Sequence, residues 1–336
     1  MGAFFEGDHP DLQSALEAHF ERIRDRLEKA GALPVEGLVL AGGYGRGEGG
    51  VFLDKEGVGH LYNDLDYFLF TREPENPSLK AWIHQIEVEE TERLGIDVEI
   101  KAMDRKAIGD PSTSMMFYDL MARHHVVAGD PHLFDPLVRN LDPSRIVPEE
   151  ATRLLWNRGS GLLFSRCSLL KIPDLDFIFR NHQKAKLALG DAWLCLQGKY
   201  RWSCQERHRL LKDLELPSAL GVLKSWHEEG VAFKFRPRPP DQTAEAFREE
   251  NEALAKAWEK VFLVVESERL GETFPDSRAY AHYAGKLFPD VSWTRAKLLS
   301  LRDQIKRGGH LKPTRDYPRG SLQRALVRLL SEWEIS

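Results

Sequence analysis

The sequence has little of what disulfide-rich, zinc-binding or membrane-spanning proteins require. Its three cysteines, Cys167, Cys195 and Cys204, form neither an even set nor a metal-ligand spacing. No apolar run is long enough to cross a bilayer, and charges occur throughout the first 31 residues. We therefore expect free thiols, no signal peptide, no membrane insertion and a cytoplasmic location.

A strong charge of one sign is also missing. The 47 basic and 52 acidic residues leave a net charge of -5, which does not favour a nucleic acid partner. No internal repeat or low-complexity tract occurs. What remains is the composition of a folded globular chain, and 336 residues suffice for two domains.

The first part of the chain mixes helical and strand patterns. Apolar residues recur at helical intervals over residues 11–29 and 77–94, which predicts two helices. Residues 37–41 form a short apolar run typical of a buried strand. Alternation with a period of two predicts further strands at residues 64–70 and 96–103. These elements predict an α/β unit in which the strands share one sheet.

Weaker patterns follow in the same unit. Residues 51–62 show no helical period and are predicted to form a loop. A helix is expected over residues 114–123. The apolar triplet that follows His124 and His125 is stopped by Gly129, which predicts a short edge strand. The two histidines are expected to cap or pack rather than to bind metal.

The pattern changes near residues 141–144, where strand-like alternation stops and helical periodicity takes over. We place a domain boundary there, which gives an α/β domain with a mixed sheet at residues 1–145 and an all-helical domain at residues 146–336. Within the second domain, the prolines of residues 236–240 predict an extended connector.

A glycine run after the first predicted strand is suited to phosphate binding. Gly42 and Gly43 have no Cβ atoms, so main-chain amides there can approach a polyphosphate closely. Tyr44 and Gly45 continue the same candidate nucleotide-binding loop, and Arg46 can contact a phosphate oxygen. The run also contains Glu48, which we interpret as a residue that orders the loop.

Two aspartates open the next strand. Alternate residues of a strand point to the same face about 6.6 Å apart, so Asp64 and Asp66 can hold two Mg²⁺ ions with the phosphates of a substrate. A third carboxylate should come from the strand at residues 96–103, where Asp97 and Glu99 share one face. We prefer Asp97 as the ligand but leave Glu99 open, and the other of the two could act as a general base.

This order of motifs resembles the DNA polymerase β-like nucleotidyltransferase superfamily over residues 35–105. The resemblance implies the nucleotidyltransferase fold and transfer of a nucleoside monophosphate from a triphosphate such as ATP to an acceptor hydroxyl, with two Mg²⁺ ions and release of pyrophosphate. Locally the glycine loop looks most like that of the bacterial uridylyltransferases and adenylyltransferases that act on nitrogen-regulation proteins. This chain has a longer link at residues 48–63 and no His-Asp dipeptide for their phosphohydrolase domain.

The overall arrangement is more similar to antibiotic nucleotidyltransferases, in which a helical half completes the pocket for a small hydroxyl-bearing acceptor. In this chain Arg180, Lys184 and Asp191 lie on one stripe of a predicted helix at residues 174–196. The resemblance implies that Lys184 contacts the triphosphate and that Asp191 is a possible acceptor contact or base. A solvated helix face would give the same charge pattern.

Other functions remain open. The chain could be a catalytically silent nucleotide-binding module, such as a regulatory or toxin–antitoxin component. A dinucleotide-binding fingerprint is also satisfied at Gly45, Gly47 and Gly50, but no helix is predicted after it. Arg201 and His208 have the spacing found in helical ribonucleases. The sequence does not indicate which base is selected, which acceptor is used or whether the protein oligomerises.

Overall fold

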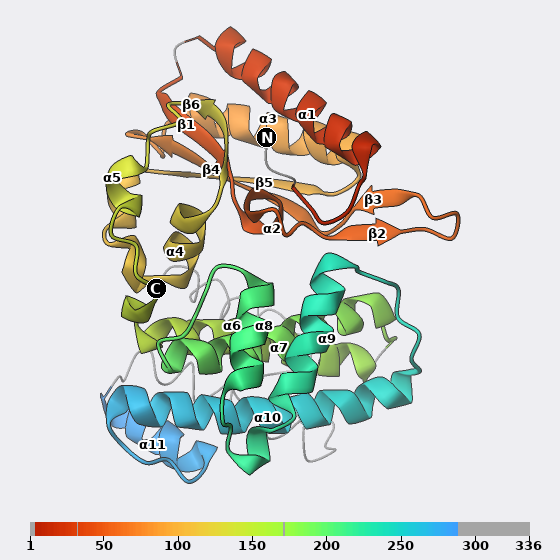
Figure 1. Ribbon diagram of the computed structural model, residues 1–336, viewed down its shortest axis with the longest axis vertical. Coiled ribbons are helices and arrows are strands. Elements are labelled where there is room, and N and C mark those ends of the chain that lie inside the picture. The colour runs from red at the N-terminus through yellow and green to blue at the C-terminus, as the bar shows by residue number, and fades with distance from the viewer. Residues whose placement is uncertain (1–3, 32, 171, 288–336) are drawn as a thin grey trace, which may run out of the picture.

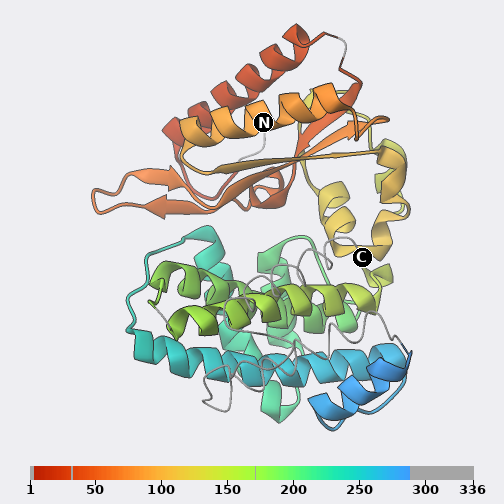
Figure 2. The same ribbon diagram turned by 180° about the vertical axis from the view of Figure 1, so that it is seen from behind.

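The computed structural model describes residues 4–31, 33–170 and 172–287. Figure 1 shows an α/β lobe, built from the elements before residue 146, packed above a helical lobe, built from those after it. Figure 2 gives the same arrangement from behind. Within the described residues, none of the helices combines the length and the apolar composition that crossing a bilayer requires.

A four-stranded mixed sheet forms the centre of the α/β lobe, with strand order β5-β4-β1-β6. β1 pairs antiparallel with β4 and with β6, whereas β4 and β5 run parallel. The bounds are β1 (Val35–Leu40), β4 (Asp64–Thr71), β5 (Asp97–Met103) and β6 (His125–Gly129). The predicted strands and the short edge strand are thus confirmed.

One face of the sheet is covered by α1 (Pro10–Lys29) and α3 (Pro77–Leu94), as Figure 2 shows. Both helices match their predictions. The sheet residues on this face, among them Leu38, Leu65 and Leu69, are fully buried against them. The Asn76 side chain accepts hydrogen bonds from the first turn of α3, and this helix is the crossover that the parallel β4–β5 pair requires.

The opposite face of the sheet packs on a smaller cluster. Phe68 and Phe70 of β4 contact residues of α4 (Met115–Ala122) and the segment before α5 (Asp135–Val138). His124, between α4 and β6, and His125, the first residue of β6, pack as expected. His124 Nδ1 lies 2.7 Å from the carbonyl oxygen of Leu120, and the His125 ring packs between aromatic side chains.

Residues 51–62 do not form a plain loop, so that prediction is wrong. β2 (Val51–Leu53) and β3 (Gly59–Leu61) pair as a short antiparallel hairpin that extends to the side of the α/β lobe (Figure 1). Asp54 orders its turn by accepting hydrogen bonds from the backbone of Glu56 and Val58. Three-residue strands are too short to show a period in the sequence.

The helical lobe is built around α7, which contacts its neighbours on several sides. Its helices are α6 (Pro148–Leu169), α7 (Leu175–Leu196), α8 (Cys204–Asp213), α9 (Leu223–Phe235), α10 (Ala244–Leu270) and α11 (Ser277–Leu287). Single 3₁₀ turns lie at Arg105–Ile108, Pro111–Thr113, Pro143–Arg145 and Ser218–Leu220. The extended connector at residues 236–240 is confirmed, and the predicted helices after residue 287 lie outside the described residues.

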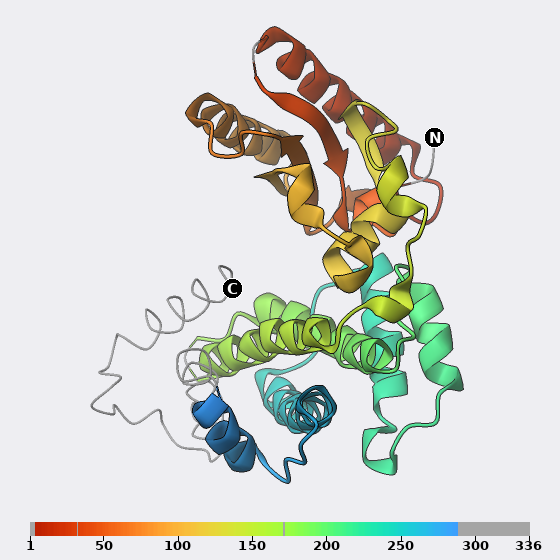
Figure 3. The ribbon, with the colours of Figure 1, turned by 90° about the vertical axis from the view of Figure 1, so that its left-hand side faces the viewer.

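Buried aromatic side chains fill the core of this lobe. Trp156, Trp258 and Phe262 contact one another in one cluster with α7. The view in Figure 3 shows α4 and the turns around it at the junction of the two lobes. The three cysteines are free, in agreement with the sequence.

Candidate active site

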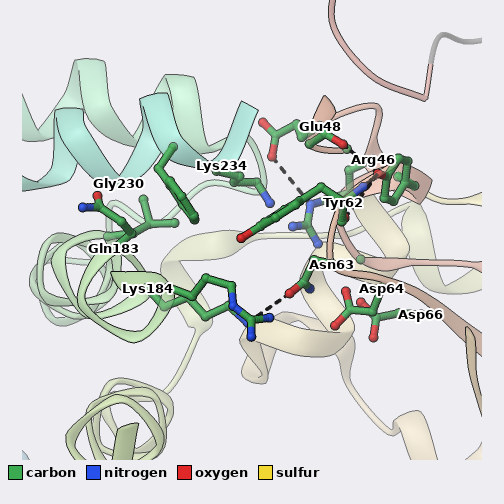
Figure 4. Close-up of a pocket in the computed structure, with 18 of the residues that line it drawn as sticks. Arg46, Glu48, Tyr62, Asn63, Asp64, Asp66, Gln183, Lys184, Gly230 and Lys234 are labelled. Carbon is green, nitrogen blue, oxygen red and sulfur yellow. Dashed lines mark hydrogen bonds and ion pairs between the residues drawn. The ribbon is translucent and has the colours of Figure 1, made fainter. Parts of the chain in front are cut away.

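A cavity of about 450 Å³ lies between the two lobes. Its α/β side consists of the glycine loop and the start of β4, and its helical side consists of α6, α7 and α9. Figure 4 shows Asp64 and Asp66 across the cavity from Gln183, Lys184 and Gly230. The lining residues are Gly42, Gly43, Tyr44, Arg46, Glu48, Gly49, Gly50, Tyr62, Asn63, Asp64, Asp66, Arg158, Arg180, Gln183, Lys184, Leu187, Gly230, Phe233 and Lys234.

The glycine loop packs directly against Asp66, the second of the two predicted aspartates of β4. After β1 the chain turns into α2 (Gly42–Arg46), a single helical turn. Gly42 has a φ of +58°, and a Cβ atom there would lie 2.2 Å from Oδ2 of Asp66. The backbone amide of Ala41 donates to the carbonyl oxygen of Asp66 at 2.8 Å, which fixes the loop to β4. Only glycine fits between the loop and this carboxylate.

We predict that Gly42→Ala destabilises the protein and displaces Asp66. The left-handed backbone alone costs a residue with a Cβ atom about 1–2 kcal/mol. Gly57→Ala is the matched control, because Gly57 has a φ of +80° but nothing within 4 Å of its Cβ position. Chemical denaturation should show a larger loss for Gly42→Ala than for Gly57→Ala. Equal losses would mean that the contact with Asp66 has no energetic consequence.

The parallel register brings a third carboxylate beside the pair. Asp66 pairs with Glu99 and Asp64 pairs with Asp97 across β4 and β5. Burial, followed by the charges of Asp64 and Glu99, raises the pKa of Asp66 to about 6, against the lowering effect of Arg46 and Lys234. Asp97 and Glu99 are both exposed, and neither is among the described residues that line the cavity. The charge of Glu99 acts on Asp66, but the register places one acid of β5 beside each aspartate, so the choice of a third ligand stays open between Asp97 and Glu99.

The residue before the aspartates has an unusual backbone. Asn63 has a φ of +75° and is the single non-glycine residue with a left-handed backbone in the described ranges. Asparagine tolerates this conformation better than most residues, and here it lies directly before Asp64. Its side-chain oxygen accepts a hydrogen bond from Nζ of Lys184 at 3.4 Å. Helix α7 of the helical lobe is thereby linked to the residue that precedes β4 in the α/β lobe.

Basic side chains line the helical side of the cavity. Arg158, Arg180 and Lys184 come from α6 and α7, and Lys234 comes from the end of α9. Burial lowers the pKa of Lys184, and the charge of Arg158 lowers it further. Burial and the charge of Arg46 likewise lower the pKa of Lys234. The positive charges at the cavity repel one another, and an anionic ligand would reduce this repulsion.

Lys234 and Arg158 are site residues that the sequence analysis missed. The ammonium of Lys234 lies 3.5 Å from the position that a Cβ of Gly43 would take, so it sits over the glycine loop. No motif surrounds either residue, and a basic residue on an amphipathic helix is normally solvated. Only the packing of α6 and α9 against the α/β lobe brings them to the cavity.

Arg46 has a different environment from the one predicted. Its guanidinium lies 3.3 Å from a carboxylate oxygen of Asp119 and 3.9 Å from one of Glu48. Glu48 in turn accepts a hydrogen bond from the backbone amide of Cys204 at 2.9 Å. Arg46 lines the cavity, but its charge is paired, and this part of the loop joins the two lobes.

Tyr44 and Gly45 hold the glycine loop in its conformation, and Tyr44 also lines the cavity. The Tyr44 hydroxyl donates to the carbonyl oxygen of Gly50 at 2.7 Å and accepts from the amide of Tyr62 at 2.8 Å. It therefore ties together the two ends of the hairpin. Gly45 is absent from the described residues that line the cavity, and a Cβ there would lie 2.1 Å from the carbonyl oxygen of Leu40. Both residues shape the loop.

The prediction for Asp191 is not supported. Asp191 is buried, and its Oδ1 lies 2.7 Å from Nε of Arg207 and 3.0 Å from Nε2 of His227. It is not among the described residues that line the cavity. It follows Lys184 by seven positions, which places it about 10 Å further along α7. Its carboxylate pairs with Arg207 and His227 inside the helical lobe, so the structure does not support a contact with the acceptor.

The ribonuclease-like pair also lies away from the cavity. His208 stacks on His227 with ring centroids 5.6 Å apart, and Arg201 lies 3.7 Å from a carboxylate oxygen of Glu206. Neither residue is among the described residues that line the cavity. The spacing in the sequence thus has a packing explanation.

Neither a protein-family model nor a curated protein matches this chain.

The donor set of the cavity suits Mg²⁺ bound together with phosphates. Among the described residues, no three His, Cys, Asp or Glu side chains converge as a complete metal site. Mg²⁺ is usually held by one or two carboxylates, with phosphate oxygens and water completing its shell. Asp64 and Asp66 are such a pair, and the pKa of Asp66 is raised first by burial and then by the charges of Asp64 and Glu99, which a bound cation would neutralise.

Proposed function

We propose that this protein is a nucleotidyltransferase with the polymerase β-like fold, which transfers a nucleoside monophosphate from a triphosphate to an acceptor hydroxyl. The observation that carries the proposal is the placement of Asp64 and Asp66 against the glycine loop, with Glu99 beside Asp66 in the parallel register. The acceptor is a small molecule or a protein.

The two sides of the cavity suit the two charges of a metal-bound triphosphate. Lys184 and Lys234, with Arg158 and Arg180, supply positive charge for the phosphates. Asp64 and Asp66 would hold two Mg²⁺ ions together with the phosphates, with the charge of Glu99 next to Asp66, and the metal would supply neutralisation of phosphate charge and activation of the hydroxyl when bound. The loop at Gly42 and Gly43 brings backbone close to the phosphates without side chains in between.

The reaction is an in-line displacement at the α-phosphorus. The acceptor oxygen forms a bond to this phosphorus while the bond to the bridging oxygen of the β-phosphate breaks, and pyrophosphate leaves. Asp97 or Glu99 of β5 would take the hydroxyl proton, because these two carboxylates pair with Asp64 and Asp66 across the strands, although neither is among the described residues that line the cavity. Lys184 and Lys234 stabilise the charge that develops on the leaving pyrophosphate.

Calorimetric titration of the protein with ATP, GTP, CTP and UTP tests this proposal. We expect at least one triphosphate to bind in the presence of Mg²⁺, and Asp64→Ala with Asp66→Ala to abolish the Mg²⁺ dependence. Lys234→Met should weaken binding about tenfold or more, because a charge-assisted contact to phosphate is lost. Lys256→Met, an exposed residue of α10, is the matched control and should have no effect.

Two results would contradict the proposal. One is that none of the four triphosphates binds, and the other is that binding is the same with and without Mg²⁺. Pyrophosphate release then separates an enzyme from a silent nucleotide-binding module. A wild-type protein that binds Mg²⁺-triphosphate but releases no pyrophosphate with any acceptor offered would favour the silent module.

A further inference from the structure

One corner of the cavity contains polar groups without partners. The Gln183 side chain is 5% exposed, yet its Oε1 has no hydrogen-bond partner in the described part of the chain. The hydroxyl oxygen of Tyr62 is buried and unpartnered in the same way. Buried polar groups are almost always hydrogen-bonded in folded proteins, and exceptions call for an explanation. Both residues line the cavity, so a ligand there can supply the missing partners.

Apolar side chains form the walls of this corner next to Gln183 and Tyr62, and the charges of Asp176 and Arg180 act on the Tyr62 hydroxyl. The rings of Tyr62 and Phe233 meet edge to face, with centroids 5.9 Å apart. Leu187 and Gly230 line the cavity beside them. A Cβ at Gly230 would lie 2.9 Å from Cβ of Leu187, so the glycine allows α9 to pack closely on α7 at this point. Aromatic and apolar walls with a few polar groups are typical of a site for a planar heterocycle.

The corner lies at the helical side of the cavity, away from the acidic residues. In Figure 4, Tyr62 extends from the α/β side and its hydroxyl points toward the helical side, where Gln183 and Gly230 lie. Asp64 and Asp66 are at the opposite side. A ligand with its phosphates at the aspartates and glycine loop would therefore have its other end near this corner.

We infer that Tyr62, Gln183, Leu187, Gly230 and Phe233 form the nucleobase subsite, and that the Gln183 carboxamide determines which base is accepted. The inference rests on the proposed function and goes beyond it. A carboxamide offers an acceptor and a donor side by side, which pairs with the edge of a base that presents the complementary set. The Tyr62 hydroxyl adds one group that can donate or accept, and the aromatic rings contact the face of the base.

The chemistry of the corner separates base recognition from phosphate recognition. The groups assigned to the base are uncharged, whereas the groups assigned to the phosphates, Lys184 and Lys234 among them, carry charge. Changes to Gln183 should therefore alter the ratio of affinities between triphosphates, and changes to Lys184 should alter all affinities alike. This difference makes the inference testable without knowledge of the acceptor.

The experiment measures dissociation constants for ATP, GTP, CTP and UTP with Mg²⁺. For the wild type we expect one triphosphate to bind about tenfold or more tightly than the weakest of the four, because a mismatched base leaves buried polar groups unpaired. Gln183→Leu should reduce this preference to within about threefold. Gln183→Glu, which replaces the amide donor with an acceptor, should change which triphosphate binds best. Lys184→Met, the matched control, should weaken all four by a similar factor.

Folding is checked by thermal unfolding of each variant. Tyr62→Phe removes only a hydroxyl group and provides a milder second test, with an expected loss of about threefold or more for the preferred triphosphate alone. If Gln183→Leu does not fold, Tyr62→Phe still tests the subsite, and an unchanged affinity of Tyr62→Phe for the preferred triphosphate would contradict it.

The outcomes distinguish the inference from the proposed function. A wild type that binds no triphosphate would overturn both. A wild type that binds triphosphates but does not discriminate between bases, or variants of Gln183 that keep the original preference, would overturn the inference and leave the proposed function standing. Variants of Gln183 that keep the base preference but raise the KM for an acceptor would show that the corner binds the acceptor. This result would also overturn the inference.

Discussion

Asp66→Asn should abolish the proposed activity and yet stabilise the protein at neutral pH. Loss of a metal-ligating carboxylate should lower kcat/KM by more than the roughly 10–100-fold typical of residues that only support a metal ligand. Stability should move in the opposite direction. Burial, Asp64 and Glu99 raise the pKa of Asp66 from 3.8 to about 6, so folding disfavours its ionised form.

The pH dependence follows from the sign of this shift. Well below pH 3.8 the carboxyl is protonated in both the folded and unfolded states, and no penalty exists. The penalty grows as the pH rises from 3.8 to about 6 and is complete above about 6. A shift of about two units corresponds to roughly 2–3 kcal/mol, which Asp66→Asn should recover in full at pH 7.5 and only in small part at pH 4.

Urea denaturation at the two pH values, with and without Mg²⁺, measures the effect. Mg²⁺ should stabilise the wild type and have little effect on Asp66→Asn. Asp213→Asn, an exposed side chain of α8, is the control and should leave stability and activity unchanged. A lower stability of Asp66→Asn than of the wild type at pH 7.5 would mean that Asp66 has a stabilising partner, and the assignment to an acidic metal site would be wrong.

Asp191→Ala should cause the largest loss of stability, about 3–5 kcal/mol. Burial disfavours the charge of Asp191, but Arg207 and His227 outweigh it and hold the pKa of this carboxyl below its usual value. Removal of Asp191 leaves the buried guanidinium of Arg207 without the partner at 2.7 Å. Leaving one buried charge without its partner destabilises a protein by more than the intact ion pair stabilises it.

A double-mutant cycle identifies the cause. Arg207→Met should also be destabilising, whereas Asp191→Ala with Arg207→Met should lose less than the sum of the two single changes, because no unpaired charge remains. The free energy of unfolding from urea titrations gives each value. If the losses of the two single variants add up to the loss of the double variant, Asp191 and Arg207 do not interact energetically, and the explanation by an unpaired charge is wrong.

Part of the site could be predicted from local sequence alone. Gly42, Asp64 and Asp66 belong to segments close together in the chain, and the strand patterns around them are strong enough to fix which side chains share a face. Their convergence on one cavity is confirmed. Lys184 was found through the amphipathic pattern of its helix together with the resemblance, and it also lines the cavity.

The remainder depends on tertiary packing, which local patterns do not contain. The pairing of Asp97 with Asp64 and of Glu99 with Asp66 depends on the register of two strands separated by a helix. Lys234 reaches the glycine loop only because α9 ends beside it. Asp191 lies on the correct stripe of α7, but Arg207 and His227 from α8 and α9 cover that part of the stripe. A helical period predicts a face and not the partner of that face.

The parallel pairing of β4 and β5 has a consequence for the fidelity of folding. Side chains along a strand alternate between the faces, so a slip of one residue would transfer every residue of β5 to the other face. Val98 and Ile100, now buried, would then face the acidic cluster, and Glu99 would face the core under α1 and α3. A misregistered chain would lose its core together with its acidic cluster. We therefore expect no stable but inactive population with the wrong register.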